Sequence, residues 1–470
     1  MSFFERNKCE NTISSVICRN KKFIIVTTTL WEAKECFLNY ESMGIPASSL
    51  FCLYQFGSDV SLQAHKAQYV LDDTFDERAG NYGYFLASQL TSPSNLAMRE
   101  ALREFDETCK AYVAFNGLFS LPEVVLSRKV LFHCSGNRFR IEDKVEGTEI
   151  LKKVGLLSEC SIHNVTDVDA ILNARTVLDK GNGVVLAFGG KWSGGAEGVV
   201  YVGSEDTAAW CRSLLPSIGL VRVMPFIKGI PVELTFVIFK DGHISVLKPE
   251  EGLTLVRSDR PSKFSFYGIN SFWQPDEVAS SLLKGVSIKL AKHLRDELEY
   301  LGVCNLNGIL DDSNSFVATE INARVPGPRP RRVFKNELYF LDAAINSFSA
   351  EDVPSLIIDA SIRQAQEDTA GVYITNFASD MKLVHLFPRT ALYPCPMIHL
   401  KIDDTGDIRF CTSTETADVV FTDNTTIKII ALQRHFQTQA RPLLVKCLNY
   451  ICKHIPATQG PRFALTLDEL

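Results

Sequence analysis

Short apolar runs rich in β-branched residues recur in the first 130 residues and predict buried strands. The first run is Lys21 to Thr29 (KKFIIVTTT), and similar runs occur at Lys110 to Phe115 and at Lys129 to Phe132. A helical pattern from Trp31 to Tyr40 follows the first run. Strands that alternate with helices predict a parallel α/β sheet. No GxGxxG motif follows the first strand, so we expect no dinucleotide site here.

The pattern changes near Asp143, where a helix is predicted to begin. Asp143 and Lys144 come first, and the stretch from Glu149 ends at Gly155, so the helix has an acidic start and a glycine stop. A lysine at a helix start can reach a polyphosphate as a point charge. Lys144 is therefore a candidate anion-binding residue, with a solvated surface lysine as the alternative.

The next pattern is strand, glycine-rich loop, strand. Gly183 to Phe188 (GVVLAF) and Val199 to Val202 (VVYV) enclose the loop GGKWSGGAEG. Glycines let backbone N–H groups approach phosphate oxygens. The loop also carries Lys191 and Ser193, next to Gly194 and Gly195. It is not a Walker A loop, which requires GKS or GKT at the start of a helix, and a flexible hairpin tip is the alternative.

An apolar connecting segment follows, from Met224 through Phe226 to Ile227, and the strand-like run IPVELTFVIF comes after it. Such a segment can hold a flat aromatic base, and Glu233 in the following run could accept a hydrogen bond from a hydroxyl group or approach a metal ion. Asp241-Gly242 predicts a hairpin turn. An ordinary antiparallel hairpin is the alternative here.

The strongest chemical pattern is a second hairpin, from Gly302 to Asp312 and from Phe316 to Arg324. Side chains alternate along a strand, so Glu320, Asn322 and Arg324 should share one face, with Thr319 and Ile321 on the other. Asn307, Glu320 and Asn322 would then gather oxygen ligands suited to Mg²⁺, while Arg324 could pair with phosphate. A solvated hairpin face is the alternative.

The remaining chain shows elements but no chemical motif. Strand-like runs occur at Val372 to Ile374, Leu383 to Leu386, Ile398 to Leu400 and Ile427 to Ala431, and Gln437 to His454 predicts a helix. Together the patterns divide the chain into three expected domains. These are residues 1–125, a helix-and-strand domain; 126–350, which holds all the candidate site residues; and 351–470, an α+β addition.

Length and composition agree with this division. The 470 residues exceed one compact core and suggest about three domains. With 46% hydrophobic and 22% charged residues, the chain is neither disordered nor fibrous. A net charge of -6 argues against nucleic-acid binding. No apolar run approaches the roughly 18 residues that a membrane-spanning helix needs. The 13 cysteines form no CxxC pair, so we expect a cytoplasmic protein with reduced thiols.

In order and spacing, the four patterns of the middle segment resemble the ATP-grasp superfamily. The resemblance covers roughly residues 130–330, and residues 20–125 look like the α/β domain that precedes it. The stretches GIPVELTFVIFKDGHISVLKPEE and NLNGILDDSNSFVATEINAR look like the amino-acid and peptide ligase branch that includes the pheganomycin peptide ligase. The resemblance implies an ATP-grasp fold, with an N-terminal pre-ATP-grasp domain and a C-terminal α+β addition.

The resemblance also implies an activity. Members of this branch use ATP with Mg²⁺ (or Mn²⁺) to join a carboxylate to an amine through an acyl phosphate, and they release ADP. We therefore expect an ATP-dependent carboxylate–amine ligase that acts on an amino acid or a peptide. A homodimer is possible, and we expect neither a nucleic acid nor a membrane as a partner.

Individual residues match the branch's motifs. Nucleotide-contacting positions match Lys144, Lys191, Ser193, Gly194, Gly195, Met224, Phe226, Ile227 and Glu233. Metal ligands match Asn307, Glu320 and Asn322, and the catalytic positions match Arg324 and Lys191. Arg329, Arg331 and Arg332 are candidates to hold a substrate carboxylate, with a solvated basic loop as the alternative.

Two positions depart from the family pattern. Ala187 stands where members usually carry a lysine, and Asn307 stands where an acidic residue or glutamine is usual. A neutral amide offsets less metal charge than a carboxylate does. These departures favour an alternative function, a nucleotide-binding pseudoenzyme that serves as a scaffold or regulatory subunit. A kinase or carboxylase-like activity ranks third, because no biotin-type segment is visible.

Overall fold

The computed structural model describes a large part of the chain. The described residues are 22–26, 47–54, 68–70, 96–108, 111–115, 129–130, 136–157, 159–189, 198–203, 219–258, 260–326, 338, 341–342, 344–346, 350–351, 353–368, 372–375, 397–403, 407–411, 419–422, 426–429, 440–454 and 463–465. None of the helices in these ranges is both long and apolar enough to cross a membrane.

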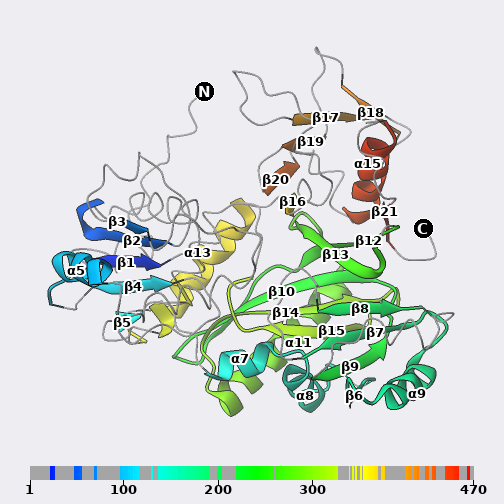
Figure 1. Ribbon diagram of the computed structural model, residues 1–470, viewed down its shortest axis with the longest axis horizontal. Coiled ribbons are helices and arrows are strands. Elements are labelled where there is room, and N and C mark those ends of the chain that lie inside the picture. Colours follow the sequence, from blue (N-terminus) through cyan, green and yellow to red (C-terminus); the bar gives the residue numbers. More distant parts are fainter. Residues whose placement is uncertain are drawn as a thin grey trace.

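The first sheet is parallel, as the sequence predicts. Its strands lie in the order β3-β2-β1-β4-β5. The bounds are β1 Phe23–Val26, β2 Leu50–Tyr54, β3 Gln68–Val70, β4 Tyr112–Phe115 and β5 Lys129–Val130, with the short helix η1 Ala47–Ser49 and helix α5 Leu96–Phe105. This sheet lies to the left in Figure 1, in blue and cyan. The helix predicted at residues 31–40 lies outside the described residues.

The second sheet is small and antiparallel, with the order β6-β9-β7-β8. Its elements are β6 Ser161–Asn164, α9 Val168–Leu178, β7 Val184–Phe188, β8 Val199–Val202 and β9 Leu220–Pro225. One face packs against α9, because Leu186, Val221 and Val223 share a hydrophobic cluster with Ile171. Strand alternation places Ala187 and Arg222 on the opposite face.

The large sheet has nine strands among the described residues. Most follow the order β15-β14-β10-β12-β13-β16-β20, while β11 pairs with β10 and β21 pairs with β12. The bounds are β10 Ile230–Ile238, β11 Ile244–Val246, β12 Glu250–Arg257, β13 Arg260–Asn270, β14 Gly302–Leu310, β15 Phe316–Asn322, β16 Val372–Thr375, β20 Thr426–Ile429 and β21 Phe463–Ala464. The predicted hairpins at Asp241-Gly242 and at residues 302–324 are both confirmed.

Helix α11, Glu277–Leu298, covers one face of this sheet. Leu234 and Leu306 point to that face, where they share a buried cluster with Leu290 and Leu294 of α11. Two shorter helices, α7 Gly136–Glu142 and α8 Glu146–Lys153, lie against β15. The other face of the sheet is therefore left for the polar residues of the same strands.

The C-terminal segment is joined to the core by main-chain pairing. Strands β16 and β20 extend the large sheet beyond β13. The segment also forms a three-stranded sheet, and its further elements are α13 Ser355–Asp368, β17 Met397–Ile402, β18 Ile408–Phe410, β19 Val419–Thr422 and α15 Arg441–His454. In Figure 1 the yellow helix α13 lies between the first sheet and the green sheets. The predicted run at residues 383–386 lies outside the described residues.

Glu251 of β12 binds the N-terminus of helix α15 to the large sheet through hydrogen bonds. Its buried carboxylate accepts hydrogen bonds from the backbone N–H groups of Ala440 (2.6 Å) and Arg441 (3.2 Å), at the start of α15. The side-chain amide of Asn270 donates a third at 2.9 Å. A carboxylate at a helix N-terminus satisfies N–H groups that have no partner within the helix.

A buried ion pair joins α7 to the segment that follows β15. Arg138 Nη2 lies 3.0 Å from Asp342 Oδ2, and their side chains are 2% and 0% exposed. Arg138 also donates to the carbonyl of Ala323 and to Tyr300 Oη, while Asp342 Oδ1 accepts from the N–H group of Val303 at 2.7 Å. Arg138 therefore fixes the end of β15 against the start of β14.

We expect Asp342→Asn to lower the free energy of unfolding by about 3 kcal/mol, because it leaves the guanidinium of Arg138 buried without its counter-charge. Urea unfolding followed by circular dichroism measures this change. Glu146→Gln is the matched control, since it removes an exposed ion pair with Arg140 at 3.0 Å and should cost under about 0.5 kcal/mol. Equal losses in the two variants would contradict the assignment.

Candidate functional site

Four polar residues form a row across the large sheet, on the face opposite α11. Glu250 of β12 lies opposite Glu233 of β10, which lies opposite Asn307 of β14, which lies opposite Glu320 of β15. Residues directly opposite on neighbouring strands share one face. Glu250 and Glu233 are buried, while the side chain of Glu320 is 30% exposed. The row therefore runs from the sheet interior towards an open edge.

The two asparagines of the predicted metal set lie against Glu320. The amide groups of Asn307 and Asn322 donate hydrogen bonds to Glu320 Oε1, at 3.0 Å and 3.4 Å. The neighbouring Ile321 is 2% exposed and packs in the core with α11. The structure thus brings the three side chains together on one face, as strand alternation predicts.

The oxygen atoms of these side chains differ in how they are used. Asn307 Oδ1 is buried and has no hydrogen-bond partner among the described residues. Asn322 Oδ1, by contrast, accepts a hydrogen bond of 2.9 Å from Arg324. A buried amide oxygen beside a carboxylate is a suitable pair of ligands for Mg²⁺. Asn307 and Glu320 therefore offer suitable oxygens for a metal ion once the Asn307 amide, whose NH2 group faces Glu320, turns its oxygen toward that carboxylate, whereas Asn322 Oδ1 would share its lone pairs between the ion and Arg324.

The described residues contain no group of three or more His, Cys, Asp or Glu side chains placed to hold a metal ion. A metal site here would therefore rely on amide oxygens together with the oxygens of a ligand, which is usual for Mg²⁺ held against phosphates.

Lys144 is aimed at the same row. It lies in the turn between α7 and α8, where Asp143 Oδ1 accepts hydrogen bonds from the N–H groups of Val145 and Glu146. The helix ends before Gly155, which has a φ of +64°, a conformation that glycine adopts readily. Lys144 Nζ lies 3.7 Å from Glu320 Oε2. The turn thus places a cation at the open end of the polar row.

Arg324 follows β15 and is held by two acceptors. Its Nε lies 3.2 Å from Glu142 Oε2, and its Nη2 donates to Asn322. The Glu142 side chain is 4% exposed, and its Oε1 has no partner among the described residues. Burial raises the pKa of Glu142, and the positive charge of Arg324 opposes that rise. Glu142 thus orients an arginine that the sequence singles out.

The connector predicted at residues 224–227 differs in detail. Strand β9 runs through Pro225, so Met224 is a buried strand residue, 3% exposed, and the connection begins only at Phe226. The Phe226 ring stacks on Phe264 of β13 at 6.0 Å and meets Tyr201 of β8 edge-on at 5.2 Å. These three rings join the small sheet to the large one. The predicted adenine contacts of Met224, Phe226 and Ile227 stay predictions.

Several predicted residues lie outside the described part of the chain. These are Lys191, Ser193, Gly194 and Gly195 of the glycine-rich loop and Arg329, Arg331 and Arg332 after β15. Their roles stay predictions.

The sequence patterns did not indicate three residues that lie near the site. Glu250 was visible only as part of the run Lys248-Pro249-Glu250-Glu251, and alternation alone does not tell which glutamate shares a face with Glu233. Glu142 directly precedes the Asp143-Lys144 motif, and Arg222 lies within an otherwise apolar strand. A charged residue inside an apolar strand is a signal that could have been used.

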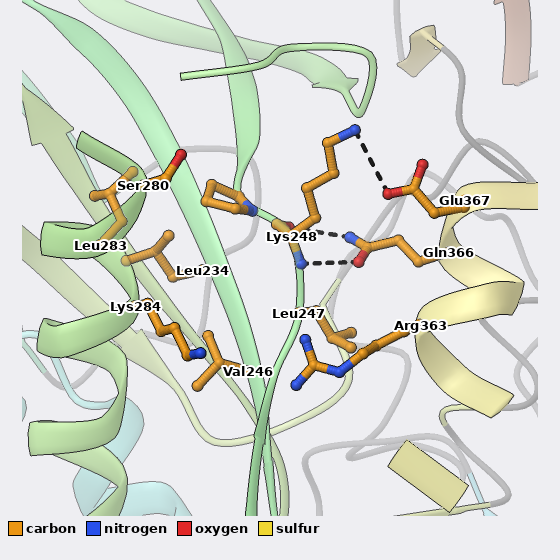
Figure 2. A pocket seen from close by; sticks show the side chains of 11 residues that line it. Leu234, Val246, Leu247, Lys248, Ser280, Leu283, Lys284, Arg363, Gln366 and Glu367 are labelled. Atoms are coloured by element: carbon orange, nitrogen blue, oxygen red, sulfur yellow. Dashed lines mark hydrogen bonds and ion pairs between the residues drawn. The ribbon is translucent and has the colours of Figure 1, made fainter. Parts of the chain in front are cut away.

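A pocket of about 280 Å³ lies on the other face of the large sheet, away from the polar row. Leu234, Val246 and Leu283 form its apolar wall, and Figure 2 shows Lys284 of α11 and Arg363 of α13 reaching into it from opposite sides. Gln366 bonds both backbone groups of Lys248. The pocket includes none of the predicted site residues, so we do not assign it to the same chemistry.

Removing Arg324 should make stability depend more strongly on pH through Glu142, whose pKa burial already raises. In Arg324→Met, burial still raises the pKa of Glu142, and of the two arginines that oppose this rise only Arg138 remains. A carboxyl group with a raised folded-state pKa is stabilising while protonated, and this contribution is lost as pH rises through that pKa. We expect a loss of about 2 kcal/mol at about pH 8 and a smaller loss at about pH 5, measured by urea unfolding.

Adding Glu142→Gln to this variant should abolish the difference between the two pH values. Arg140→Met, which changes an exposed arginine of the same helix, is the control and should behave alike at both. A loss that does not vary with pH would show that Glu142 is not the titrating group.

The sequence matches no protein-family model and no curated protein sequence. Solved structures are similar in fold. One is a biotin carboxylase from Campylobacter jejuni in a β,γ-ATP complex, with 15% identity and a TM-score of 0.51, which covers 82% of this chain and 77% of that one. Another is the biotin carboxylase domain of the Hydrogenobacter thermophilus 2-oxoglutarate carboxylase, with 12% identity and a TM-score of 0.50, covering 87% and 86%. Identities this low show the fold alone: the chain has the ATP-grasp fold.

Proposed function

We propose that this protein is an ATP-dependent, ADP-forming carboxylate–amine ligase that acts on an amino acid or a peptide. The observation that carries the proposal is the cluster of Lys144, Asn307 and Glu320 on the face of the large sheet opposite α11. Lys144 Nζ is 3.7 Å from Glu320, and Asn307 donates to the same carboxylate. A lysine, a carboxylate and a buried amide oxygen suit a nucleotide polyphosphate with its Mg²⁺ or Mn²⁺ ion.

When bound, ATP supplies the phosphoryl group that activates a carboxylate. The chain's own residues bring charges together and exclude water. Lys144 would neutralise phosphate charge, and Asn307 with Glu320 would hold the metal ion, so that two anions could approach each other. Glu233 and Glu250 extend the polar row into the buried part of the sheet, where their side chains have little contact with solvent.

Arg324 is the residue we propose to act on the reacting acid. Glu142 and Asn322 fix its guanidinium, and a fixed guanidinium is suited to two parallel hydrogen bonds with a carboxylate or phosphate. We propose that Arg329, Arg331 and Arg332 hold the substrate carboxylate and that the glycine-rich loop with Lys191, Ser193, Gly194 and Gly195 covers the phosphates. We also propose a cytoplasmic homodimer with small-molecule substrates.

A nucleotide-binding protein without turnover is the second candidate. Ala187 and the neutral Asn307 favour it, and so does the hydrogen bond that occupies Asn322 Oδ1. A carboxylation reaction is the third. The Hydrogenobacter domain was solved with MgADP and bicarbonate, and bicarbonate would take the place of the amino acid as the activated acid. Only the acceptor and the released product distinguish these reactions.

ATP with Mg²⁺ should raise the melting temperature, because a ligand that binds only the native state stabilises it; a concentration of about 100 times Kd gives about 2.7 kcal/mol. Glu320→Gln should lose most of the Mg²⁺-dependent part of this shift and release at least about tenfold less ADP. Glu367→Gln, which changes an exposed glutamate beside Lys248 on the other face, is the matched control.

Release of ADP with pools of amino acids, with mass spectrometry of the product, distinguishes the candidates. A new amide supports the ligase. A melting shift without ADP supports the second candidate, and ADP released only with bicarbonate supports the third. If millimolar ATP and Mg²⁺ produced no shift, the proposal would be wrong.

A further inference from the structure

Arg222 is a buried cation for which the described part of the chain supplies no counter-ion. It lies on β9 of the small sheet and is 3% exposed. No carboxylate of the described residues forms an ion pair with it, and its Nε has no hydrogen-bond partner among them. A buried charge without an opposite charge costs several kcal/mol, a cost that an anion bound beside it would offset.

Arg222 points between the two sheets. Its Nη1 donates to Thr148 Oγ1 of α8 at 3.0 Å and to the backbone carbonyl of Thr319 on β15 at 2.7 Å. Thr319 directly precedes Glu320, the residue that meets Lys144 and Asn307. The guanidinium therefore lies beside the proposed nucleotide site, but it comes from the opposite sheet.

The surroundings of Arg222 do not neutralise it. Cys160 lies close enough to interact with the guanidinium electrostatically, but burial raises the pKa of that thiol, which keeps it protonated at neutral pH. Glu320 also interacts with Arg222 electrostatically, but its carboxylate is already bonded by two asparagines and approached by Lys144. Burial lowers the pKa of Arg222 itself. A negative charge supplied from outside would remove this penalty.

The small side chain of Ala187 makes room for this arginine. Ala187 on β7 lies directly opposite Arg222 on β9, and Ile162 on β6 lies opposite Arg222 on its other side. Ala187 is fully buried on the same face. A lysine at 187 would place two cations directly opposite each other, which is destabilising. The position where the ATP-grasp resemblance leads us to expect a lysine is therefore next to a cation on the neighbouring strand.

We infer that Arg222 is an anion-binding residue, and that it supplies from β9 the positive charge for a nucleotide polyphosphate that Ala187 does not supply from β7. The inference deepens the proposed function and rests on it for the identity of the ligand. That Arg222 binds a polyphosphate can be tested whether or not this polyphosphate belongs to ATP.

The test compares Arg222→Met with Arg222→Met/Ala187→Lys, in which the cation moves to the neighbouring strand. Calorimetry with ATP, ADP and inorganic tripolyphosphate, and competition with adenosine, measures binding. Loss of one charge-assisted contact should weaken ATP and tripolyphosphate by about 10- to 100-fold. Adenosine binding should stay unchanged, and the double variant should recover at least about tenfold.

Arg175→Met is the matched control, because Arg175 on α9 of the same small sheet bonds the carbonyl of Gly203 and lies away from the polar row. It should bind all four ligands like the wild type. Thermal unfolding checks that each variant folds; if Arg222→Met does not fold, Arg222→Gln, which removes the charge but keeps an amide donor, and Arg222→Gln/Ala187→Lys provide the same comparison.

Three outcomes would overturn the inference. Arg222→Met could bind ATP and tripolyphosphate like the wild type. It could lose adenosine in the same proportion with no recovery in the double variant, which is the result of a purely structural contact. The wild type could also bind neither ATP nor tripolyphosphate. If instead the wild type binds tripolyphosphate through Arg222 but does not bind ATP, the inference stands and the proposed function fails.

Discussion

The pairing of β10 with β14 and β15 is the constraint on which the rest of the molecule depends. Nine consecutive residues of β10, from Ile230 to Ile238, are paired with β14, and β15 continues the ladder. Side chains alternate with a period of two, so a slip by one residue would exchange the faces. The polar row would then be buried against α11, and Leu234, Leu306 and Ile321 would lie on the face that the row now occupies. Core packing therefore also assembles the site, because the apolar residues that fix the strand register determine on which face the polar row lies.

The small sheet is attached to this ladder by contacts of two kinds. Tyr201, Phe226 and Phe264 form an apolar contact near the point where β9 leads into β10. At the other contact, Arg222 of the small sheet donates to the carbonyl of Thr319 on β15. The aromatic contact does not depend on nearby charges, whereas the strength of the arginine contact depends on the charged groups near the guanidinium. An anion between the sheets would therefore act on one junction and leave the other unchanged.

Local patterns in the sequence were enough for the elements and for part of the site. The hairpin at residues 302–324, with Glu320 and Asn322 on one face, follows from alternation over a few residues, and the parallel strands β1, β4 and β5 follow from short β-branched apolar runs. The row does not follow, since joining Glu233 to Asn307 requires the register between strands that are about 70 residues apart in the chain, and joining Glu250 requires the register of a further strand. Strands β16 and β20 carry only four residues each, so nothing local indicates that they extend the large sheet. Glu142 and Arg222 act through partners far away in the sequence, and a single strand pattern does not contain those partners.

Ala187 and Asn307 show why single positions are poor measures of what a site can do. Each departs from the pattern of the superfamily that the sequence resembles, and each taken alone indicates a weaker site. In three dimensions Ala187 lies directly opposite Arg222, so that face of the small sheet carries a positive charge on β9 where the resemblance leads us to expect one on β7. Asn307 keeps a buried oxygen next to Glu320 while removing one negative charge from a row that already holds Glu233 and Glu250. Because electrostatic attraction depends on the distance between charges and not on which strand carries them, the retained cation and the removed negative charge both favour an anionic ligand between the sheets.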